Sequence, residues 1–329
     1  MPNSETVAEM RGLIRIGVGL AVMGGLFVST VAAWPIVQPE RLGTLSGDVE
    51  RGAYLARSSG CVACHTNTEA GGPALAGGAP LDTPFGGFVP PNITLDSEAG
   101  IGNWTLDQFA IAIRQGINPD GAAYYPAFPY EFYAHFTDQD IADLWAALAI
   151  VPTVSEPAKS HSVSFPFNQR WGLKLWRAAF SQPVELSPVI GRSETWNRGQ
   201  ELVQGAAHCA ACHTARNFLG GLSNTPFTGN DTLPGGSVAP DITPETLLAS
   251  GWNQSNLAYA LRTGITPSGD VFGGSMAEVI KQGTAFLDET DRAAIAAYLT
   301  NEADPAVQPP SDGVSDSGGM VHTPGMVMQ

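Results

Sequence analysis

Basic side chains, strand-like alternation and methionine are all scarce in this sequence. Lys and Arg number 16 against 31 Asp and Glu, and the formal net charge of −15 excludes a nucleic-acid-binding surface and predicts that a charged partner presents a basic face. Few segments alternate apolar and polar residues as a half-buried strand does, so we expect an all-α fold. No methionine occurs between Met23 and Met276, so the first half of the chain lacks a thioether beyond its N-terminal run.

One long uncharged run stands near the N-terminus, "IGVGLAVMGGLFVSTVAAW". Its nineteen residues, 16–34, follow Arg11 and Arg15 and stop at Pro35, a length that suits a membrane-spanning helix with the arginines on the cytoplasmic side. A cleavable signal peptide is the alternative, because residues 31–33 resemble a small-residue cleavage site. The run exceeds a usual signal core, which favours an uncleaved anchor, and both readings export the rest of the chain.

All four cysteines occur in two pairs, and a histidine directly follows each pair. The motifs "CVACH" and "CAACH" match the C-x-x-C-H signature of covalent haem c attachment and comprise Cys61, Cys64, His65, Cys209, Cys212 and His213. The thiols bind the haem vinyl groups, and the histidine becomes the proximal iron ligand. A zinc knuckle, a redox pair or a structural disulfide would not explain the repeated histidine, so we expect two covalently attached haems.

The two motifs belong to an internal repeat with an offset of 148 residues. "GGFVPPNIT" matches "GGSVAPDIT", and "RGAYLARSSGC" matches "RGQELVQGAAHC" with one extra residue. The length of 329 residues also suits two domains of roughly 100 to 150 residues with connectors. We predict an anchor or signal segment at 1–42, haem domains at 43–152 and 193–302, a connector at 153–192 and a disordered tail at 303–329.

Each copy is expected to contain a helix before the motif, a helix after Trp104 or Trp252, and a closing helix. The closing helices are "TDQDIADLWAALAI" and "DETDRAAIAAYLT", in which Thr or Asp caps precede apolar residues at helical spacing.

Met276 is the candidate sixth ligand of the second haem. It follows His213 by 63 residues, in an apolar segment expected to be a loop, and His/Met coordination raises the reduction potential. A lone methionine more often fills a core. Its isolation in the sequence favours ligation here.

The same spacing from His65 ends at Phe128, which has no lone pair to donate. Three arrangements remain for the first haem: ligation by His135, an open five-coordinate site, or a ligand from elsewhere such as His161 or a tyrosine of residues 124–136. A histidine in an aromatic segment is more often packed than ligating, but no methionine competes with His135 in this copy.

Three segments, 165–180, 196–221 and 273–299, resemble the cytochrome c subunits of membrane-bound periplasmic dehydrogenases, and the resemblance covers about residues 47–300. It implies two tandem class I cytochrome c domains behind an N-terminal transmembrane helix, on the periplasmic face of the cytoplasmic membrane. The implied donor is a periplasmic dehydrogenase, of the alcohol, gluconate or aldehyde type. The implied acceptor is a respiratory oxidase, quinone or a soluble cytochrome. Members of the family often carry three haems, whereas this chain has two motifs.

The resemblance also assigns roles to individual residues. Where the family commonly has methionine, in "YPAFPY" and "HFTD", this chain has Phe128 and Phe136. Pro73 resembles the class I proline whose carbonyl orients the proximal histidine, and the second copy has "RNFLGG" instead, with no proline. His208 is expected to pack near a haem rather than ligate. Arg114 and Arg262 are candidate partners of haem propionates, although an exposed helix face explains either arginine equally well.

The leading function is a di-haem electron carrier without catalysis of its own. The alternative is a di-haem enzyme of the peroxidase or thiosulfate dehydrogenase type, which would use an open first haem. Residues 168–180 form a basic helix that either lies on the membrane or, as we favour, packs as a connector. In the tail, Met320, His322, Met326 and Met328 are candidate copper(I) ligands.

Overall fold

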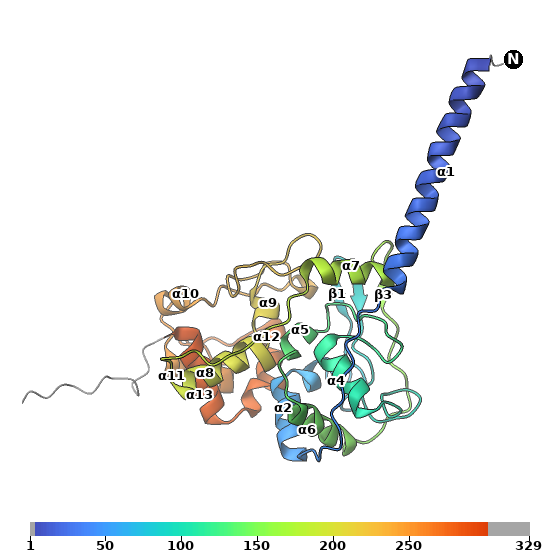
Figure 1. The fold of residues 1–329 in the computed structure, drawn as a ribbon. Coiled ribbons are helices and arrows are strands. Elements are labelled where there is room, and N and C mark those ends of the chain that lie inside the picture. Colours follow the sequence, from blue (N-terminus) through green and yellow to red (C-terminus); the bar gives the residue numbers. More distant parts are fainter. Residues whose placement is uncertain (1–3, 302–329) are drawn as a thin grey trace, which may run out of the picture.

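The computed structural model describes residues 4–301, which form a helical body and one projecting helix (Figure 1). Helix α1 (Ser4–Ala33) extends away from the body, and its Met10–Ala33 part, with a mean hydropathy of 2.0, is long and apolar enough to cross a membrane. Length and composition alone support that reading. The tail with its candidate copper ligands lies outside the described residues.

The first repeat has helices before its motif, after Trp104 and at its end, as predicted. Its elements are α2 (Val49–Ser58), α3 (Cys61–His65), β1 (Leu81–Thr83), β2 (Gly86–Phe88), α4 (Leu106–Gln115), α5 (Tyr130–Tyr133) and α6 (Asp138–Ala149). The connector contains β3 (Ser162–Val163) and α7 (Arg170–Phe180).

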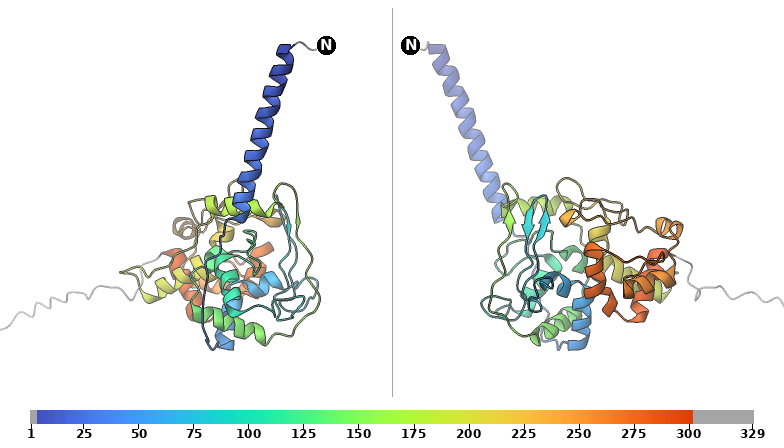
Figure 2. Two further views of the ribbon diagram at one scale, coloured as in Figure 1. Left: turned by 45° about the vertical axis from the view of Figure 1, so that its right-hand side comes forward. Right: turned by 180° about the vertical axis from the view of Figure 1, so that it is seen from behind.

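The second repeat follows the same order and lies beside the first (Figures 1 and 2). Its elements are α8 (Glu194–Glu201), the π-helix η1 (Leu202–Ala206), α9 (Ala210–His213), η2 (Pro234–Gly236), α10 (Pro244–Ala249), α11 (Gln254–Thr263), α12 (Gly274–Gln282), η3 (Thr284–Phe286) and α13 (Glu289–Thr300). One buried apolar cluster runs through both repeats and joins Leu144 and Leu148 to Leu202 and Ile295.

The all-α prediction missed a small sheet. Strands β1, β2 and β3 pair antiparallel in that order, with Leu81 opposite Phe88 and Gly86 opposite Val163. Strands of two or three residues are too short to show a period of two in the sequence. Gly86 is required in β2, because a Cβ there would lie 2.3 Å from the carbonyl oxygen of Ser162.

Equivalent helices begin and end in the same way in the two repeats. Helix α4 begins with a capping box formed by Thr105 and Gln108, and α11 begins with one formed by Asn253 and Asn256. Each then ends at a left-handed glycine, with φ of +62° in the first repeat and +77° in the second. The repeat seen in the sequence is therefore a repeat of local structure.

The helix before each motif crosses the closing helix of its repeat at a glycine. A Cβ on Gly52 would lie 1.8 Å from the carbonyl oxygen of Asp143 in α6, and a Cβ on Gly199 would lie 2.0 Å from that of Ala294 in α13. An ion pair accompanies each crossing, Arg51 with Asp143 and Arg198 with Asp291. Because α2 leads directly into Cys61, this crossing sets the position of the attachment motif.

We expect Gly52→Ala to destabilise the protein by about 1 to 3 kcal/mol or more, because the new methyl group meets backbone that cannot move aside. Gly172→Ala, in α7 with nothing within 4 Å, is the matched control and should be neutral or stabilising by roughly 0.5 to 1 kcal/mol. Denaturant unfolding of the two variants measures the difference, and equal stabilities would contradict the proposed role of the crossing.

Asp143 should make the stability depend on pH in acid. Burial raises its pKa, but hydrogen bonds from the Asp48 N–H, Gln139 and Arg51 outweigh burial and hold the pKa below its usual value. Stabilisation is therefore complete above the unfolded-state pKa of about 3.9 and is lost as the pH falls through the folded-state pKa. Asp143→Asn should have a lower free energy of unfolding than the wild type at neutral pH, and that free energy should depend less on pH below about pH 4. Free energies of unfolding of the wild type and the variant, measured from about pH 2.5 to 6 in steps of ~0.5 unit, test this prediction. Parallel curves for the two proteins would contradict it.

Candidate haem sites

Each C-x-x-C-H motif forms a short helical turn with free thiols. Helix α3 starts after Gly60, whose φ is +72°, and none of the four cysteines forms a disulfide. Burial raises the pKa of Cys61 to about 12, and burial also raises that of Cys209 to about 12, so both sulfurs are held as thiols. Among the residues that the structure describes, no three His, Cys, Asp or Glu side chains converge as metal ligands.

A proline carbonyl orients each motif histidine. His65 Nδ1 donates to the carbonyl oxygen of Pro91 at 2.8 Å, and His213 Nδ1 donates to that of Pro240 at 2.8 Å. Because a carbonyl only accepts, Nδ1 carries the proton in both rings and Nε2 remains available to a metal. The expectation for Pro73 was wrong: the orienting residue is the second proline of "VPP" in the first repeat, and "VAP" supplies its counterpart.

Electrostatics favours the ligating form of both imidazoles. Burial lowers the pKa of His65 and of His213, and it outweighs the proline hydrogen bond, which acts in the opposite direction. The neutral imidazole that results is the form that binds metal. Two thiols and an oriented imidazole in each motif are the donor set of a c-type haem, so the residues fit that group.

Met276 lies in the first turn of α12 rather than in the expected loop, because helix α12 already begins at Gly274. Its side chain is partly buried and packs against the apolar cluster that includes the second motif. The structure thus gives the second repeat a thioether in its core.

The corresponding part of the first repeat is aromatic. Phe128 packs edge to face with Tyr124 and against Tyr133, whose ring centroids lie 5.8 Å from that of Phe128 in both cases. The Tyr133 hydroxyl donates to the Ser59 carbonyl oxygen at 2.6 Å, and the ring lies close to Cys61 and Cys64. The side chain of this stretch that approaches the motif is therefore Tyr133.

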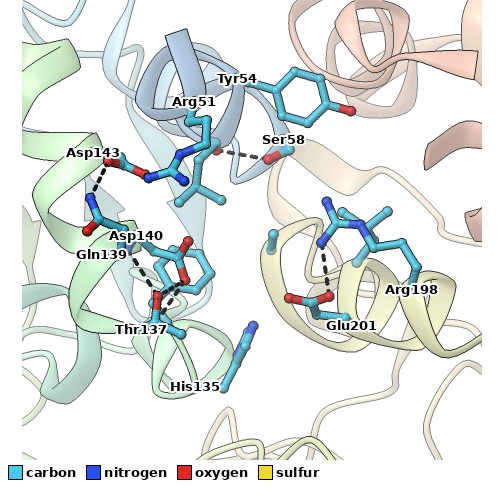
Figure 3. A pocket seen from close by; sticks show the side chains of 14 residues that line it. Arg51, Tyr54, Ser58, His135, Thr137, Gln139, Asp140, Asp143, Arg198 and Glu201 are labelled. Carbon is cyan, nitrogen blue, oxygen red and sulfur yellow. Dashed lines mark hydrogen bonds and ion pairs between the residues drawn. The ribbon is translucent and has the colours of Figure 1, made fainter. Parts of the chain in front are cut away.

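His135 points into the space between the repeats (Figure 3). A Cβ built on Gly205, in η1 of the second repeat, would lie 2.3 Å from His135 Cε1 and 2.6 Å from Nε2. His161 lies elsewhere, packed on Phe88 and Tyr125, and accepts a hydrogen bond from the Val89 N–H at 3.0 Å.

The two arginines of the repeat have different surroundings. Arg114 is engaged by Glu40 at 2.6 Å, Asp138 at 2.8 Å and the Phe136 carbonyl oxygen at 2.7 Å. Arg262 is exposed on α11. Arg114 therefore ties α4 to the start of α6 and to the segment that follows α1.

The two motifs lie near each other at the interface between the repeats. Cys64 lies within electrostatic reach of Cys212 and Glu278, and α12 of the second repeat packs on α3 of the first. His208, directly before Cys209, reaches the first repeat: its ring lies edge to face with Tyr133 at 5.7 Å and beside Gly60. Its Nδ1 donates to the Ala206 carbonyl oxygen at 2.8 Å, which fixes the ring.

Polar contacts complete the interface around a cavity of about 370 Å³ (Figure 3). The Tyr54 hydroxyl donates to Asp291 at 2.8 Å and accepts from the Asp288 N–H at 3.2 Å. Burial raises the pKa of Tyr54, so the phenol keeps its proton. Neither attachment motif lines this cavity, which separates it from the candidate haem positions.

Sequence reasoning missed several of these residues. Pro91 and Pro240 occupy matching places in "GGFVPPNIT" and "GGSVAPDIT", so the repeat alignment held a signal for both. Tyr133 is one of the tyrosines of residues 124–136 that were candidate ligands, but nothing in the sequence indicated its contact with the motif or singled out Tyr54, because their partners are distant in the chain.

A helical body with C-x-x-C-H turns whose histidines are oriented by backbone carbonyls defines a c-type cytochrome. A family model for cytochrome c matches residues 196–302. The chain is 38% identical over 294 residues to a "Diheme cytochrome c-type" of Cereibacter sphaeroides, covering 88% of this chain and 98% of that one. The chain belongs to this family of di-haem c-type cytochromes.

Dehydrogenase subunits are also similar to the chain. It is 38% identical to a fructose dehydrogenase cytochrome subunit of Gluconobacter japonicus, over 76% of this chain and 52% of that subunit. It is 36% identical to a gluconate 2-dehydrogenase cytochrome c subunit of Pantoea cypripedii, over 76% of this chain and 58% of that subunit. The chain therefore spans little more than half the length of these subunits. Such relatives imply electron transfer through haem c.

We expect Tyr54→Phe to weaken the contact between the repeats by about 1 to 2 kcal/mol, because it removes the donor to Asp291 and the acceptor for the Asp288 N–H. Tyr259→Phe, at an exposed position on α11, is the control. Denaturant unfolding followed at the haem absorption band should show reduced stability in Tyr54→Phe alone. Equal loss in the two variants would show that the hydrogen bonds contribute nothing specific.

Proposed function

We propose that the chain is a membrane-anchored electron carrier with two covalently attached haem c groups. It takes electrons from a periplasmic dehydrogenase or another donor and passes them to the respiratory chain. The observation that carries the proposal is the pair of C-x-x-C-H turns whose histidines are oriented by proline carbonyls, with Cys64 near Cys212 across the interface between the repeats. A bound c-type haem supplies a one-electron ferric/ferrous couple.

The residues proposed to hold the first group are Cys61, Cys64 and His65, and those proposed for the second are Cys209, Cys212, His213 and Met276. The Pro91 and Pro240 carbonyls fix the planes of the two imidazoles and leave Nε2 free to bind a metal. A rigid ligand set favours electron transfer, because little rearrangement accompanies a change of oxidation state.

The first site has two competing arrangements. His135 is the candidate sixth ligand, and its present contact with Gly205 means that ligation requires its side chain to turn away from the second repeat. In the other arrangement, Phe128 and Tyr133 wall an open sixth position. Phe128 is the specific observation that favours the second candidate function, a di-haem enzyme of the peroxidase or thiosulfate dehydrogenase type.

The interface residues keep the two attachment points close. His208 fills the space between the motifs and is held by its own backbone, while Tyr133 contacts it from the first repeat. Because Tyr54 and α12 fasten the repeats on either side, the separation between the two sites is fixed by packing. A fixed short separation is what an internal electron relay requires.

The proposed partners follow from the relatives and from charge. Relatives named as subunits of fructose, alcohol and gluconate dehydrogenases support a dehydrogenase as donor. The proposed acceptors are a respiratory oxidase, quinone or a soluble cytochrome, and the net charge of −15 favours a basic face on a protein partner. Helix α1, with Arg11 and Arg15 toward the cytoplasm, would hold both repeats in the periplasm.

Ferric electron paramagnetic resonance and carbon monoxide binding distinguish the carrier from the enzyme. In the carrier, the wild type shows two low-spin signals and no carbon monoxide binding, and His135→Ala converts the first haem to a high-spin, carbon monoxide-binding form. His161→Ala is the matched control, since His161 binds the Val89 N–H away from the motif. A wild-type high-spin signal with rapid carbon monoxide binding would instead establish the open site and favour the enzyme.

The second site is tested separately by Met276→Leu, which keeps the apolar volume and removes the thioether. We expect a high-spin ferric signal, new carbon monoxide binding and a lower reduction potential at that haem, because methionine ligation raises the potential. An unchanged potential and spectrum would contradict ligation by Met276.

A further inference from the structure

Large apolar side chains are exposed at the end of the body from which α1 emerges. Phe218 is 87% exposed, Phe165 is 78% exposed and Trp34 is 64% exposed. Further apolar side chains, Phe167, Leu175 and Leu219, are also exposed. We call these six residues the membrane-side surface.

The six residues belong to segments that are tied together. Helix α7 packs beside the end of α1, where Lys174 Nζ donates to the carbonyl oxygens of Ala32 at 2.5 Å and Trp34 at 2.6 Å. Trp176 Nε1 donates to the Leu219 carbonyl oxygen at 2.8 Å, which holds the loop carrying Phe218 against α7. Figures 1 and 2 show α7 lying across the end of the body that carries α1.

The basic residues of α7 are turned toward the protein. Arg170 donates to the Ala123 carbonyl oxygen at 2.9 Å, and Arg177 donates to that of Gln115 at 2.7 Å. Their guanidinium groups also lie over the rings of Tyr125 and Tyr130. Helix α7 is thus a connector whose arginines hold it against the body, and Leu175 lies on its exposed side.

Charge distribution separates these segments from the rest of an acidic chain. No Asp or Glu occurs between Glu156 and Glu185, or between Glu201 and Asp231, although the chain has 31 such residues. The first of these acid-free segments carries Lys159, Arg170, Lys174 and Arg177. The repulsion that an acidic surface would experience at an anionic bilayer is therefore relieved at this end of the body.

We propose that the membrane-side surface lies in the interfacial layer of the bilayer that α1 spans. Aromatic side chains are enriched at that depth, and interfacial binding strengthens with the apolar area that is buried. Lipid is favoured over a protein occupant because the surface is continuous with the end of the apolar helix and is contributed by the connector and the second repeat together. With two points of contact, the body cannot rotate freely about α1, so the haem motifs keep one orientation relative to the membrane. This inference rests on the proposed anchoring.

The test uses the full-length, haem-loaded chain in vesicles of phosphatidylcholine with phosphatidylglycerol. A nitroxide is attached at Phe165→Cys or Phe218→Cys, because the thioethers occupy the natural cysteines. Matched labels at Ile150→Cys, at the C-terminal end of α6, and at Tyr259→Cys, on α11, occupy exposed sites. Flotation measures anchoring, and relaxation by oxygen or by a water-soluble nickel complex measures the depth of each label.

We expect labels at 165 and 218 to be relaxed more by oxygen than by nickel, and labels at 150 and 259 to show the reverse. A chain that floats with nickel-accessible labels at 165 and 218 would overturn this inference and leave the anchor standing. A chain that does not float would overturn the anchor and the inference together. Labels shielded only after a purified dehydrogenase is added would show that the surface binds protein, which would also overturn the inference.

Discussion

The glycine-mediated crossing of two helices in each repeat fixes nearly everything else in this protein. Gly52 and Gly199 let the helix before each motif approach the backbone of the closing helix more closely than any side chain allows. The Arg51–Asp143 and Arg198–Asp291 pairs set the rotation of the helices at that contact. Since each motif comes soon after the helix that makes the crossing, the crossing determines the positions of the motif's thiols and imidazole.

A single extra residue makes the two repeats different. The second repeat has one more residue than the first before its motif, and the structure accommodates it in the π-helix η1 (Leu202–Ala206), where Gly205 departs from helical backbone angles. This bulge faces His135, and the chain after it carries His208 into the first repeat. π-Bulges often occur at functional sites, and here the bulge contacts α2 and α5 of the first repeat.

Sequence patterns predicted the helices far better than they predicted the contacts between helices. Helices α2, α4 and α6 and their counterparts follow from caps and apolar spacing, which are local properties. The sheet was missed because its strands are very short, and Met276 was placed in a loop because the turn of helix that holds it begins at a left-handed glycine, Gly274. Pro73 was expected from its resemblance to a family proline close after the motif, whereas the orienting carbonyl belongs to Pro91, which is 26 residues from His65 in the chain.

By itself, the sequence determined the two C-x-x-C-H motifs, the internal repeat and the apolar N-terminal run, because each of them consists of adjacent or regularly spaced residues. Only the tertiary structure decided which proline carbonyls orient His65 and His213, and that His135 faces the second repeat. It also decided that the exposed aromatic residues gather beside α1. These arrangements depend on how helices distant in sequence pack against one another, and no local pattern specifies that packing.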